Sequence, residues 1–397
     1  MKPPAFGALV VGGGVHGLAT AWRLARAPAA GGSGVERVAL VERFRLHHDR
    51  GSSHGFARIT RTTYSDERYV RLTRVAHAED WPLLERESER TLIHRCDGLF
   101  FGPPEGDLER WAAAVAAAGA SGVERLEVRE ARRRFPAFAL PDSEFVLHDT
   151  TGGVVAAAET LLALDRRCRV EGVHVLEETR VLAIDPSSDP VVVDTDRGRL
   201  LAERVVVTAG AWVAGLVPAM RGAVSVSRQH VGYFDVGPAG EFGRFPVWVY
   251  LGGDASGLFY GLPAFGRPGI KAALHGVSAS GDDPETHPGP DAQAIAGVRS
   301  FLASQLTLPI GDTLHAETCL YTNTPDEHFV IGPLPGHANV VVGSICSGHG
   351  FKFGPLMGRI LAGLVLDGTS GVPEFERCRE AFAVPSVPGA HAPGRVP

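Results

Sequence analysis

Three glycines near the start of the chain have the spacing of a phosphate-binding turn. Gly12, Gly14 and Gly17 follow an apolar run at 8–11 and precede an Ala- and Leu-rich stretch at 18–27. In a turn between a strand and a helix, the first such glycine permits the tight turn, the second lets a pyrophosphate approach, and the third allows close packing. The free N–H groups of the following helix attract the anion. These residues therefore predict a site for a phosphate-bearing cofactor.

An acidic residue supports the same site. A second apolar run, 38–41, ends in Glu42, whose carboxylate can accept hydrogen bonds from an adenosine ribose. The connection before this run, 28–36, is rich in Gly and Ala and is longer than usual. Strand, glycine turn, helix and acid in this order predict dinucleotide binding, and they leave open which dinucleotide binds.

Two later stretches also allow the backbone to come close to a ligand. The run VVVTAGAW at 205–212 has the pattern of a buried strand that ends in small residues. Another buried strand is expected at 340–342, followed by a glycine-rich turn at 343–350 and a helix over 353–366. A glycine-rich turn before a helix is typical of a second anion or flavin cradle.

A polar, turn-rich segment at 47–64 carries two arginines, Arg58 and Arg61. Long irregular segments inside a compact domain are usually functional or disordered, and the glycines, serines and arginines here favour one that wraps a charged ligand. On the pattern alone an ordinary surface loop is the better interpretation, so the role of this segment depends on further evidence.

Composition excludes several classes of function. The chain has 397 residues, 44% of them apolar, and a net charge of −6, which suits two folded domains and gives no footprint for nucleic acid or an anionic membrane. No apolar run reaches the length of a membrane helix, and the N-terminus is the predicted strand rather than a signal peptide. The five cysteines are scattered without C-x-x-C spacing, which predicts a reducing, cytoplasmic location and no metal site.

The expected elements interleave two kinds of domain. Helices are expected over 67–89, 108–118, 127–135, 155–170 and 292–306, and strands at 145–148, 174–177 and 191–194. A long strand at 224–236 and short strands at 248–250, 258–262 and 270–275, with Gly and Pro between them, are typical of an antiparallel sheet. The predicted fold class is α/β. A Rossmann-type nucleotide domain (1–88, 146–223 and 318–397) is interleaved with an antiparallel-sheet substrate domain (89–145 and 224–317).

Longer motifs resemble a known family. They are GSSHGFARITRTTY at 51–64, FYGLPAFG at 259–266, IKAALH at 270–275, TCLYTNTPDEHFVIG at 318–332 and SGHGFKFGP at 347–355. In order and spacing the chain resembles the D-amino-acid-oxidase superfamily of FAD enzymes, and within it the group of monomeric sarcosine oxidase and N-methyltryptophan oxidase. The resemblance covers the chain from 6 to about 366.

The resemblance implies FAD, attached covalently through a cysteine thioether to the flavin 8α carbon. Cys319 stands at that position, and a thiolate is the nucleophile that an activated flavin methyl requires. The other four cysteines are interpreted as small buried hydrophobic residues. The implied cofactor contacts are Gly12, Gly14, Gly17, Glu42, Arg43, Ser52, Ser53, Arg58, Val181, Gly210, Trp212, Cys319, Gly348, Gly350, Phe351 and Lys352.

The resemblance also assigns two arginines and a lysine. Arg58 is implied to face the flavin, although Ser53 and Ala57 depart from the His and Thr that are common beside it. Arg61 matches the arginine that binds the substrate carboxylate, and Lys352 matches its partner. A guanidinium suits this role because its planar fork pairs bidentately with a carboxylate.

Further residues are implied at the flavin face. Lys271 matches the family's oxygen-activating lysine, where a fixed cation stabilises charge that develops on oxygen. His275 lies four residues later, and on a strand positions 271 and 275 share one face. Three tyrosines are expected to wall the same cavity, with core packing as the alternative interpretation: Tyr64, Tyr260 and Tyr321.

By this resemblance, the chain is expected to be an oxidase of secondary, N-methyl α-amino acids such as sarcosine. The amine is oxidised to an imine that hydrolyses, and O2 is reduced to H2O2. Alternatives are an oxidase of cyclic imino acids of the pipecolate or proline type in a biosynthetic pathway, a dehydrogenase with another acceptor, and a flavin-binding protein without turnover. The expected assembly is a monomer.

Overall fold

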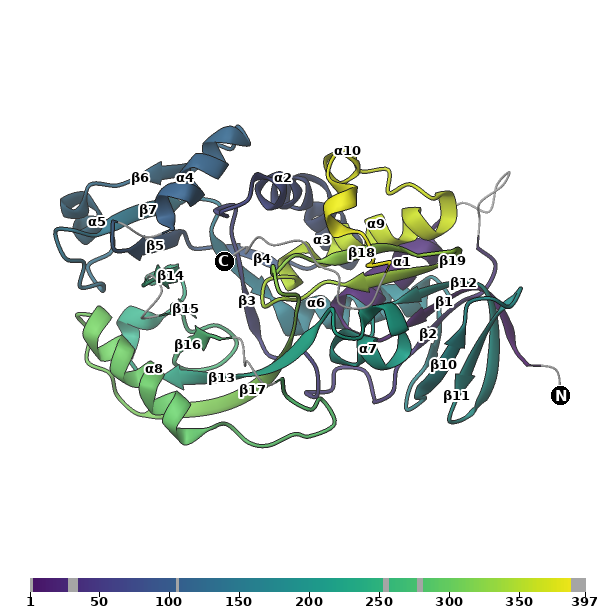
Figure 1. Ribbon diagram of the computed structural model, residues 1–397. Coiled ribbons are helices and arrows are strands. Elements are labelled where there is room, and N and C mark those ends of the chain that lie inside the picture. The colour runs from purple at the N-terminus through teal and green to yellow at the C-terminus, as the bar shows by residue number, and fades with distance from the viewer. Residues whose placement is uncertain (1–2, 28–34, 105–106, 253–256, 277–280, 387–397) are drawn as a thin grey trace.

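The computed structural model describes residues 3–27, 35–104, 107–252, 257–276 and 281–386. The strands form two large sheets of eight strands each and a small sheet of three. The first large sheet and its helices lie on the right of Figure 1, and the second lies on the left. Since each large sheet draws strands from several parts of the chain, the two are interleaved in sequence as expected.

The first large sheet has a parallel centre. Its parallel strands are β9 (His174–Leu176), β2 (Val38–Val41), β1 (Ala5–Val11), β12 (Gly198–Val207) and β19 (His337–Ser344). Antiparallel strands extend it: β10 (Val181–Asp185), β11 (Val191–Thr195) and β18 (Val330–Leu334). The strand β2 is buried along its whole length, as expected for a parallel strand that is covered on both faces.

Three helices pack together beside this sheet. They are α1 (Val15–Ala25), α6 (Ala157–Val170) and α9 (Gly354–Asp367). The helix α1 contacts both of the others, and its closest neighbour is α9. Small residues make this contact possible, because a Cβ atom on Gly358 would lie 2.6 Å from the backbone carbon of Ala19.

The second large sheet is mostly antiparallel. Its order is β17 (Thr313–Asn323), β13 (Ser225–Phe234), β16 (Ile270–His275), β15 (Leu258–Leu262), β14 (Val247–Leu251), β5 (Gly98–Gly102), β7 (Phe145–Asp149) and β6 (Val123–Arg125). Only β14 and β5 pair in parallel among these neighbours. The helix α8 (Ala292–Gln305) packs against β13 and β16, and α4 (Leu108–Ala117) and α5 (Val128–Arg134) pack near β7 (Figure 1).

The small sheet corrects two sequence expectations. Its strands are β3 (Ala57–Thr60), β8 (Gly153–Ala156) and β4 (Ile93–Arg95). The segment expected to be irregular therefore contains β3, and the helix expected from residue 155 begins only at Ala157, because β8 pairs with both neighbours first. The expectation of one long helix at 67–89 is also inexact: α2 (Glu67–Val75) and α3 (Trp81–Ser88) are separated by a π-turn at Ala76–Asp80.

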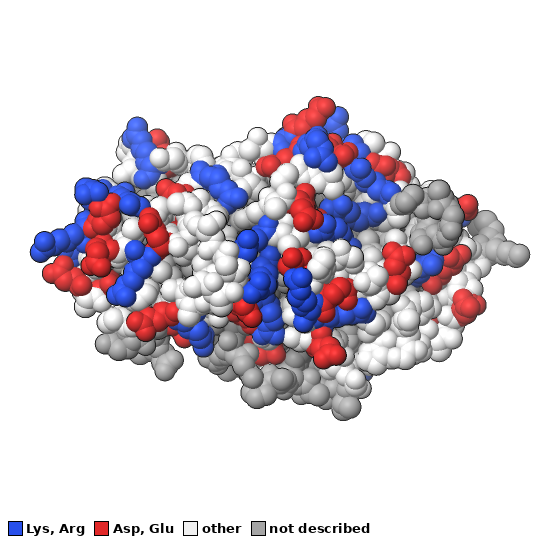
Figure 2. All heavy atoms as spheres, turned by 90° about the horizontal axis from the view of Figure 1, so that it is seen from above, with Lys and Arg blue, Asp and Glu red and all other residues white. Residues whose placement is uncertain are grey.

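The division into two domains stays a prediction. The strand β17 runs without a break through the boundary expected at residue 318, and β10, which the sequence pattern missed, joins the first sheet. Among the described residues, no helix is long and apolar enough to cross a membrane. The face seen from above carries acidic and basic side chains interspersed (Figure 2).

The contact between α1 and α9 gives a test of the fold. Gly358→Ala should lower the free energy of unfolding by about 1–3 kcal/mol, because the added methyl group meets backbone atoms of Ala19 that cannot move aside cheaply. Gly297→Ala on the exposed face of α8 is the matched control, since nothing lies within 4 Å of its Cβ position. There we expect a gain of up to about 1 kcal/mol from helix propensity. Equal urea midpoints for both variants would contradict the tight contact.

Candidate active site

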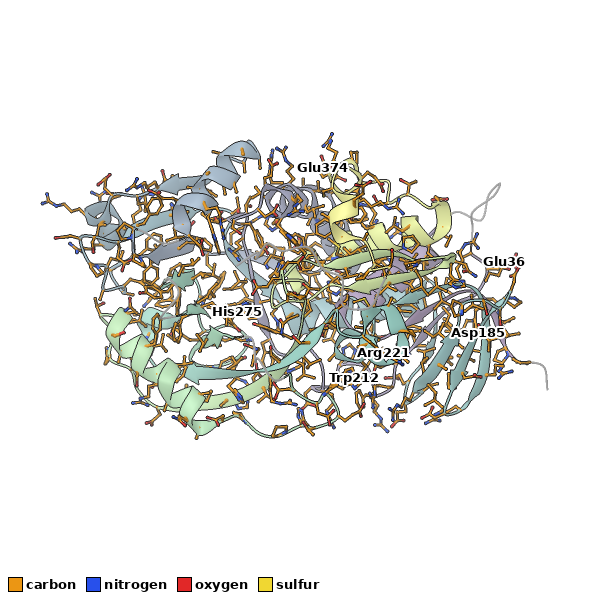
Figure 3. All side chains as sticks on the ribbon, viewed as in Figure 1. Glu36, Asp185, Trp212, Arg221, His275 and Glu374 are labelled. Atoms are coloured by element: carbon orange, nitrogen blue, oxygen red, sulfur yellow. The ribbon has the colours of Figure 1, made fainter. Side chains whose placement is uncertain are left out.

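A cavity of about 590 Å³ lies between the two large sheets. Its walls include the turn between β1 and α1, the ends of β2, β12 and β19, and strands β15, β16 and β17 of the second sheet. Ligands of open α/β sheets bind outside the carboxyl ends of the strands, which is where this cavity begins. Two wall residues are labelled in Figure 3: His275 among the strands of the second sheet, and Trp212 beside the short helix α7 (Val213–Leu216).

One end of the cavity has the features of a nucleotide site. Glu42 is buried and accepts hydrogen bonds from the backbone N–H groups of Gly13 (2.7 Å) and Phe44 (2.9 Å). Burial alone would raise the pKa of Glu42, but hydrogen bonds from His48 and these two N–H groups outweigh it and keep the pKa below its ordinary value. The carboxylate is therefore ionised and suited to accept ribose hydroxyls.

The glycine turn has two separate tasks. Gly14 is the N-cap of α1 and lines the cavity, so the N-terminus of this helix borders the ligand space, where the Val15 N–H donates to the Ser53 hydroxyl (3.2 Å). Gly17 does not line the cavity. A Cβ on Gly17 would lie 1.8 Å from the Gly12 carbonyl oxygen and 2.7 Å from the Thr208 hydroxyl, so this glycine lets the helix pack onto the turn. Its expected role as a direct cofactor contact is corrected to close packing.

At the other end, Gly348 brings two parts of the wall together. Its φ is +76°, and a Cβ there would lie 2.5 Å from both the His275 and the Tyr321 ring. The two rings have centroids 5.3 Å apart. Burial, Arg61 and Lys352 lower the pKa of His275 to about 4, so this side chain is neutral near pH 7.

Arg61 is held between aromatic rings. Its guanidinium carbon lies 4.3 Å from the centroid of the Tyr64 ring and 4.4 Å from that of Trp111, and one N–H group donates to the Thr63 carbonyl (2.5 Å). The side chain is buried yet still lines the cavity. Burial lowers the pKa of this guanidinium, but its ordinary value is so high that the charge remains.

Lys352 lies beside Arg61. Its Nζ donates to the Tyr64 hydroxyl (2.8 Å) and to the His349 carbonyl (2.7 Å), and it also lines the cavity. Burial, followed by the charge of Arg61, lowers the pKa of Lys352 well below its ordinary value. Within the described part of the chain, neither cation forms an ion pair with a carboxylate. The nearest negative influence is the buried Asp149, which acts on Arg61 without forming an ion pair with it. A buried guanidinium and a buried lysine without a direct carboxylate partner favour the binding of an anion, and that anion would in turn favour the protonated form of Lys352.

A second cluster of charged side chains consists of Lys271, Arg58 and Glu317. Nζ of Lys271 donates to the Ala57 carbonyl (3.3 Å) and lies 3.7 Å from Oε1 of Glu317. Burial and the charge of Arg58 lower the pKa of Lys271 to about 8, and Glu317 acts in the opposite direction. Arg58 is held by three backbone carbonyls, those of Ser52, His54 and Ala57.

Two cysteines line the cavity. Cys319 on β17 is half-buried, and burial raises the pKa of its thiol while Arg58 and Lys271 act to lower it. Cys346, in the turn after β19, accepts a hydrogen bond from the Thr322 N–H at 3.4 Å. The sequence motif singled out Cys319 alone, and the cavity contains both.

Most of the residues expected at the site do meet in this cavity. The wall includes Gly12, Gly14, Glu42, Arg43, Ser52, Ser53, Arg58, Arg61, Val181, Gly210, Trp212, Tyr260, Lys271, His275, Cys319, Tyr321, Gly348, Gly350, Phe351 and Lys352. Besides Gly17, one further residue expected in the wall, Tyr64, does not line the cavity. It is fully buried and contacts Arg61 and Lys352, so it holds both cations in place.

Sequence reasoning missed three residues. Glu317 could have been found, because positions 317, 319 and 321 share one face of a strand. Glu285 could not, since it lies in a loop and becomes part of the wall only by pairing with Arg43 and accepting from the Trp212 indole (3.0 Å). Trp111 on α4 looked like an ordinary core residue, and only the fold shows its contact with Arg61.

Comparison with known proteins identifies the family. The family model described as FAD dependent oxidoreductase matches residues 8–364. The chain belongs to this family. Its fold class and its enzyme class, a flavin oxidase acting on CH–NH donors, are as predicted.

Individual relatives are consistent with this family assignment. The chain is 31% identical to monomeric sarcosine oxidase of Bacillus sp. (strain B-0618), over 91% of this chain and 93% of that protein. It is 30% identical to N-methyl-L-tryptophan oxidase of Salmonella dublin, over 91% and 95%. A solved structure of NikD, described as an unusual amino acid oxidase essential for nikkomycin biosynthesis, superposes with a TM-score of 0.82 at 27% identity, over 98% of this chain and 100% of that one.

The residues present fit FAD. The ionised Glu42 could accept the ribose hydroxyls and the N-terminus of α1 could bind the pyrophosphate, while the glycine-rich turn with Gly348 lines the far end of the cavity. Arg58 and Lys271 stand beside Cys319, at the same end as that turn.

The ribose acceptor can be tested by substitution. In a Cys319→Ser background, in which FAD binds reversibly, Glu42→Gln should raise the dissociation constant of FAD for the apoprotein about tenfold, because an amide replaces one charged acceptor. FAD fluorescence quenching measures the constant. Glu177→Gln is the matched control, since Glu177 also accepts a backbone N–H, that of Leu46 at 2.6 Å, outside the cavity. Equal FAD affinity in the two variants would exclude Glu42 as the ribose acceptor.

Proposed function

We propose that the protein is an FAD-dependent oxidase of secondary α-amino acids, with N-methyl amino acids such as sarcosine as substrates. The observation that supports this proposal most is the buried pair Arg61 and Lys352, which lies in the cavity wall without a carboxylate partner in the described chain. A free α-carboxylate would supply the missing charge. The names of the relatives point to the same class of substrate.

Arg61 and Lys352 would together form a clamp for the substrate carboxylate. The guanidinium of Arg61 provides a planar fork of donors, and the ammonium of Lys352 provides a point charge. The Tyr64 and Trp111 rings lie close to the Arg61 guanidinium and would fix its position without neutralising its charge, so its remaining N–H groups stay available to a carboxylate. Lys352 is fixed by the Tyr64 hydroxyl and the His349 carbonyl. Since both cations share Tyr64, the substrate carboxylate would be held in one orientation, with the donor carbon turned toward the rest of the cavity.

The remaining wall would set the shape of the substrate site. His275 is neutral near pH 7 and adds no third positive charge beside the clamp. Tyr260 and Tyr321 provide flat surfaces in the same wall. When bound, FAD accepts a hydride equivalent from the carbon next to the amine nitrogen and passes the electrons to O2.

The overall reaction would balance as amine plus O2 plus water to carbonyl, demethylated amine and H2O2. For an N-methyl substrate the imine hydrolyses to formaldehyde and the free amino acid. Lys271 would stabilise the charge that develops on oxygen, because a fixed, buried ammonium provides this field without reorganisation. Arg58, whose guanidinium carbon is 5.5 Å from the Phe351 ring, would face the flavin.

A cyclic imino acid is the second candidate substrate. The same two cations would hold its carboxylate, and the solved structure reported above is that of an amino acid oxidase described as essential for nikkomycin biosynthesis. Flavin binding without turnover would require neither the clamp nor Lys271.

A monomeric assembly and a cytoplasmic location stay predictions. None of the five cysteines, all of which lie in the described chain, forms a disulfide.

The clamp predicts a dependence on the substrate carboxylate. Each charge-assisted hydrogen bond is worth about 1.5–3 kcal/mol, so Arg61→Ala should weaken substrate binding by about one to two decades. The limiting rate of anaerobic flavin reduction should also fall, because the donor carbon loses its orientation. The measurement is flavin bleaching with N-methyl and cyclic amino acids and with their amides at matched concentration.

The matched control for this variant is Arg125→Ala. Arg125 also lies over an aromatic ring, that of Phe145 at 4.3 Å, but outside the cavity. We expect it to reduce the flavin at the wild-type rate. If the wild-type protein were bleached equally fast by an acid and by its amide, the carboxylate clamp and the amino-acid assignment would both be wrong.

Covalent attachment of the flavin through Cys319 gives a separate test. We expect the flavin to stay with the protein after acid precipitation in the wild type and in Cys346→Ser, and to be released from Cys319→Ser. The two cysteines line the same cavity, so the comparison controls for effects of removing a thiol there. Release of the flavin from Cys346→Ser and its retention in Cys319→Ser would show that Cys346, and not Cys319, forms the bond.

A further inference from the structure

The carboxylate of Glu317 lies beside Lys271 in the second sheet. In that sheet β13 stands between β16, which carries Lys271, and β17, which carries Glu317. Oε1 of Glu317 lies 3.7 Å from Nζ of Lys271 and accepts a hydrogen bond from the Tyr233 hydroxyl at 2.8 Å. Tyr233 is itself paired with Lys271 across the strands. The carboxylate, the ammonium and the phenol thus form one buried group on three adjacent strands.

The Glu317 carboxylate is the negative charge next to Lys271, and it counteracts the positive charge of Arg58. In the described chain Glu317 is the one acidic residue within ion-pair distance of Lys271, and both line the cavity. Their side chains are 17% and 6% exposed, so water screens the pair only weakly. Arg58 is the positive group that acts most strongly on Lys271. An ammonium in such a place tends to lose its proton unless a negative charge accompanies it.

We propose that Glu317 is a positioning residue that keeps Lys271 protonated and holds its ammonium toward the flavin side of the cavity. This inference rests on the proposed role of Lys271 in the reaction with oxygen. A neutral amine would leave the developing charge on oxygen without its cation. Glu317 would therefore set the pH range in which the second half-reaction is fast, without touching substrate or oxygen itself.

The sign of the effect follows from the groups around Lys271. They are Arg58 from β3, His54 from the loop before it, Tyr233 from β13, and Glu317 and Cys319 from β17, with His315 facing the far oxygen of Glu317. Burial and Arg58 lower the pKa of Lys271 to about 8, and Glu317 raises it. Removal of the Glu317 charge should therefore lower the pKa further, and Lys271 would lose its proton closer to neutral pH.

An unusual composition allows this pKa to be measured directly. The chain has three lysines, Lys2, Lys271 and Lys352, against 36 arginines. Flavin-loaded protein labelled with [ε-13C]lysine therefore gives three resonances, which Lys271→Met and Lys352→Met assign. In Glu317→Gln the midpoint for Lys271 should fall by about one pH unit or more, the usual effect of one close charge. The Lys352 midpoint should stay where it is, because Glu317 does not contact it.

The half-reactions provide the second readout. The rate of reoxidation by O2 should decline as pH rises through the Lys271 midpoint, and in Glu317→Gln this decline should move to lower pH by the same interval. At low pH the variant should approach the wild-type rate, whereas a merely structural defect would lower the rate at every pH. Glu317→Asp keeps the charge and should restore most of the profile. Anaerobic reduction by substrate should change little.

Tyr233→Phe gives a test of opposite sign. It removes a hydrogen bond to Oε1 but leaves the charge, so Glu317 becomes freer to pair with Lys271. The midpoint for Lys271 should rise or stay, and it should not fall. A fall equal to that in Glu317→Gln would show that both variants only disturb packing, and it would overturn the inference. This variant also decides the question if Glu317→Gln does not fold.

The outcomes separate the inference from the function on which it rests. If Lys271→Met slows reduction by substrate as much as reoxidation, the oxygen role of Lys271 is wrong. If Lys271→Met slows reoxidation selectively but Glu317→Gln leaves the Lys271 midpoint and the pH profile unchanged, only the role of Glu317 is wrong.

Discussion

Two basic side chains are buried against the same aromatic ring, and in the described chain neither forms an ion pair with a carboxylate, although Asp149 acts on Arg61 from beyond that distance. The guanidinium of Arg61 and the ammonium of Lys352 lie 4.3 and 5.3 Å from the centroid of the Tyr64 ring. Removing such ions from water costs several kcal/mol each. Ring faces and two backbone carbonyls hold them in place without cancelling their charge. The fold thus maintains a local excess of positive charge that an anionic ligand relieves.

The choice between lysine and arginine carries information in this chain. With 36 arginines and three lysines, a cation is almost always an arginine, and two of the lysines line the cavity. A compact ammonium fits between the Tyr64 hydroxyl and the His349 carbonyl, where a planar fork would need more room. An ammonium also responds to its surroundings, because burial and neighbouring charges move its pKa into the physiological range, as at Lys271.

Local patterns predicted one part of the site, and long-range packing determined the rest. The glycine turn and Glu42 were recognisable because a strand, a turn and a helix follow each other within the chain. The long motifs supplied Arg61, Lys271 and Cys319 through a family resemblance. Trp111 and Glu285 gave no local signal, because their roles arise only when α4 and a distant loop pack against Arg61 and Arg43. For the same reason the boundary between β8 and α6 was misplaced, since strand pairing overrode helix propensity there.

The alternation of the second sheet explains why chemically different residues face one cavity. Along β17, positions 317, 319 and 321 place a carboxylate, a thiol and a phenol in the wall, and along β16 positions 271 and 275 place an ammonium and an imidazole there. A one-residue shift of register would turn each set into the opposite face. The backbone of Gly348 then closes the cavity against His275 and Tyr321, where any side chain would collide with both rings. The glycine-rich turn after β19 and the wall formed by β16 and β17 therefore meet at Gly348, and a side chain at this position would displace both rings.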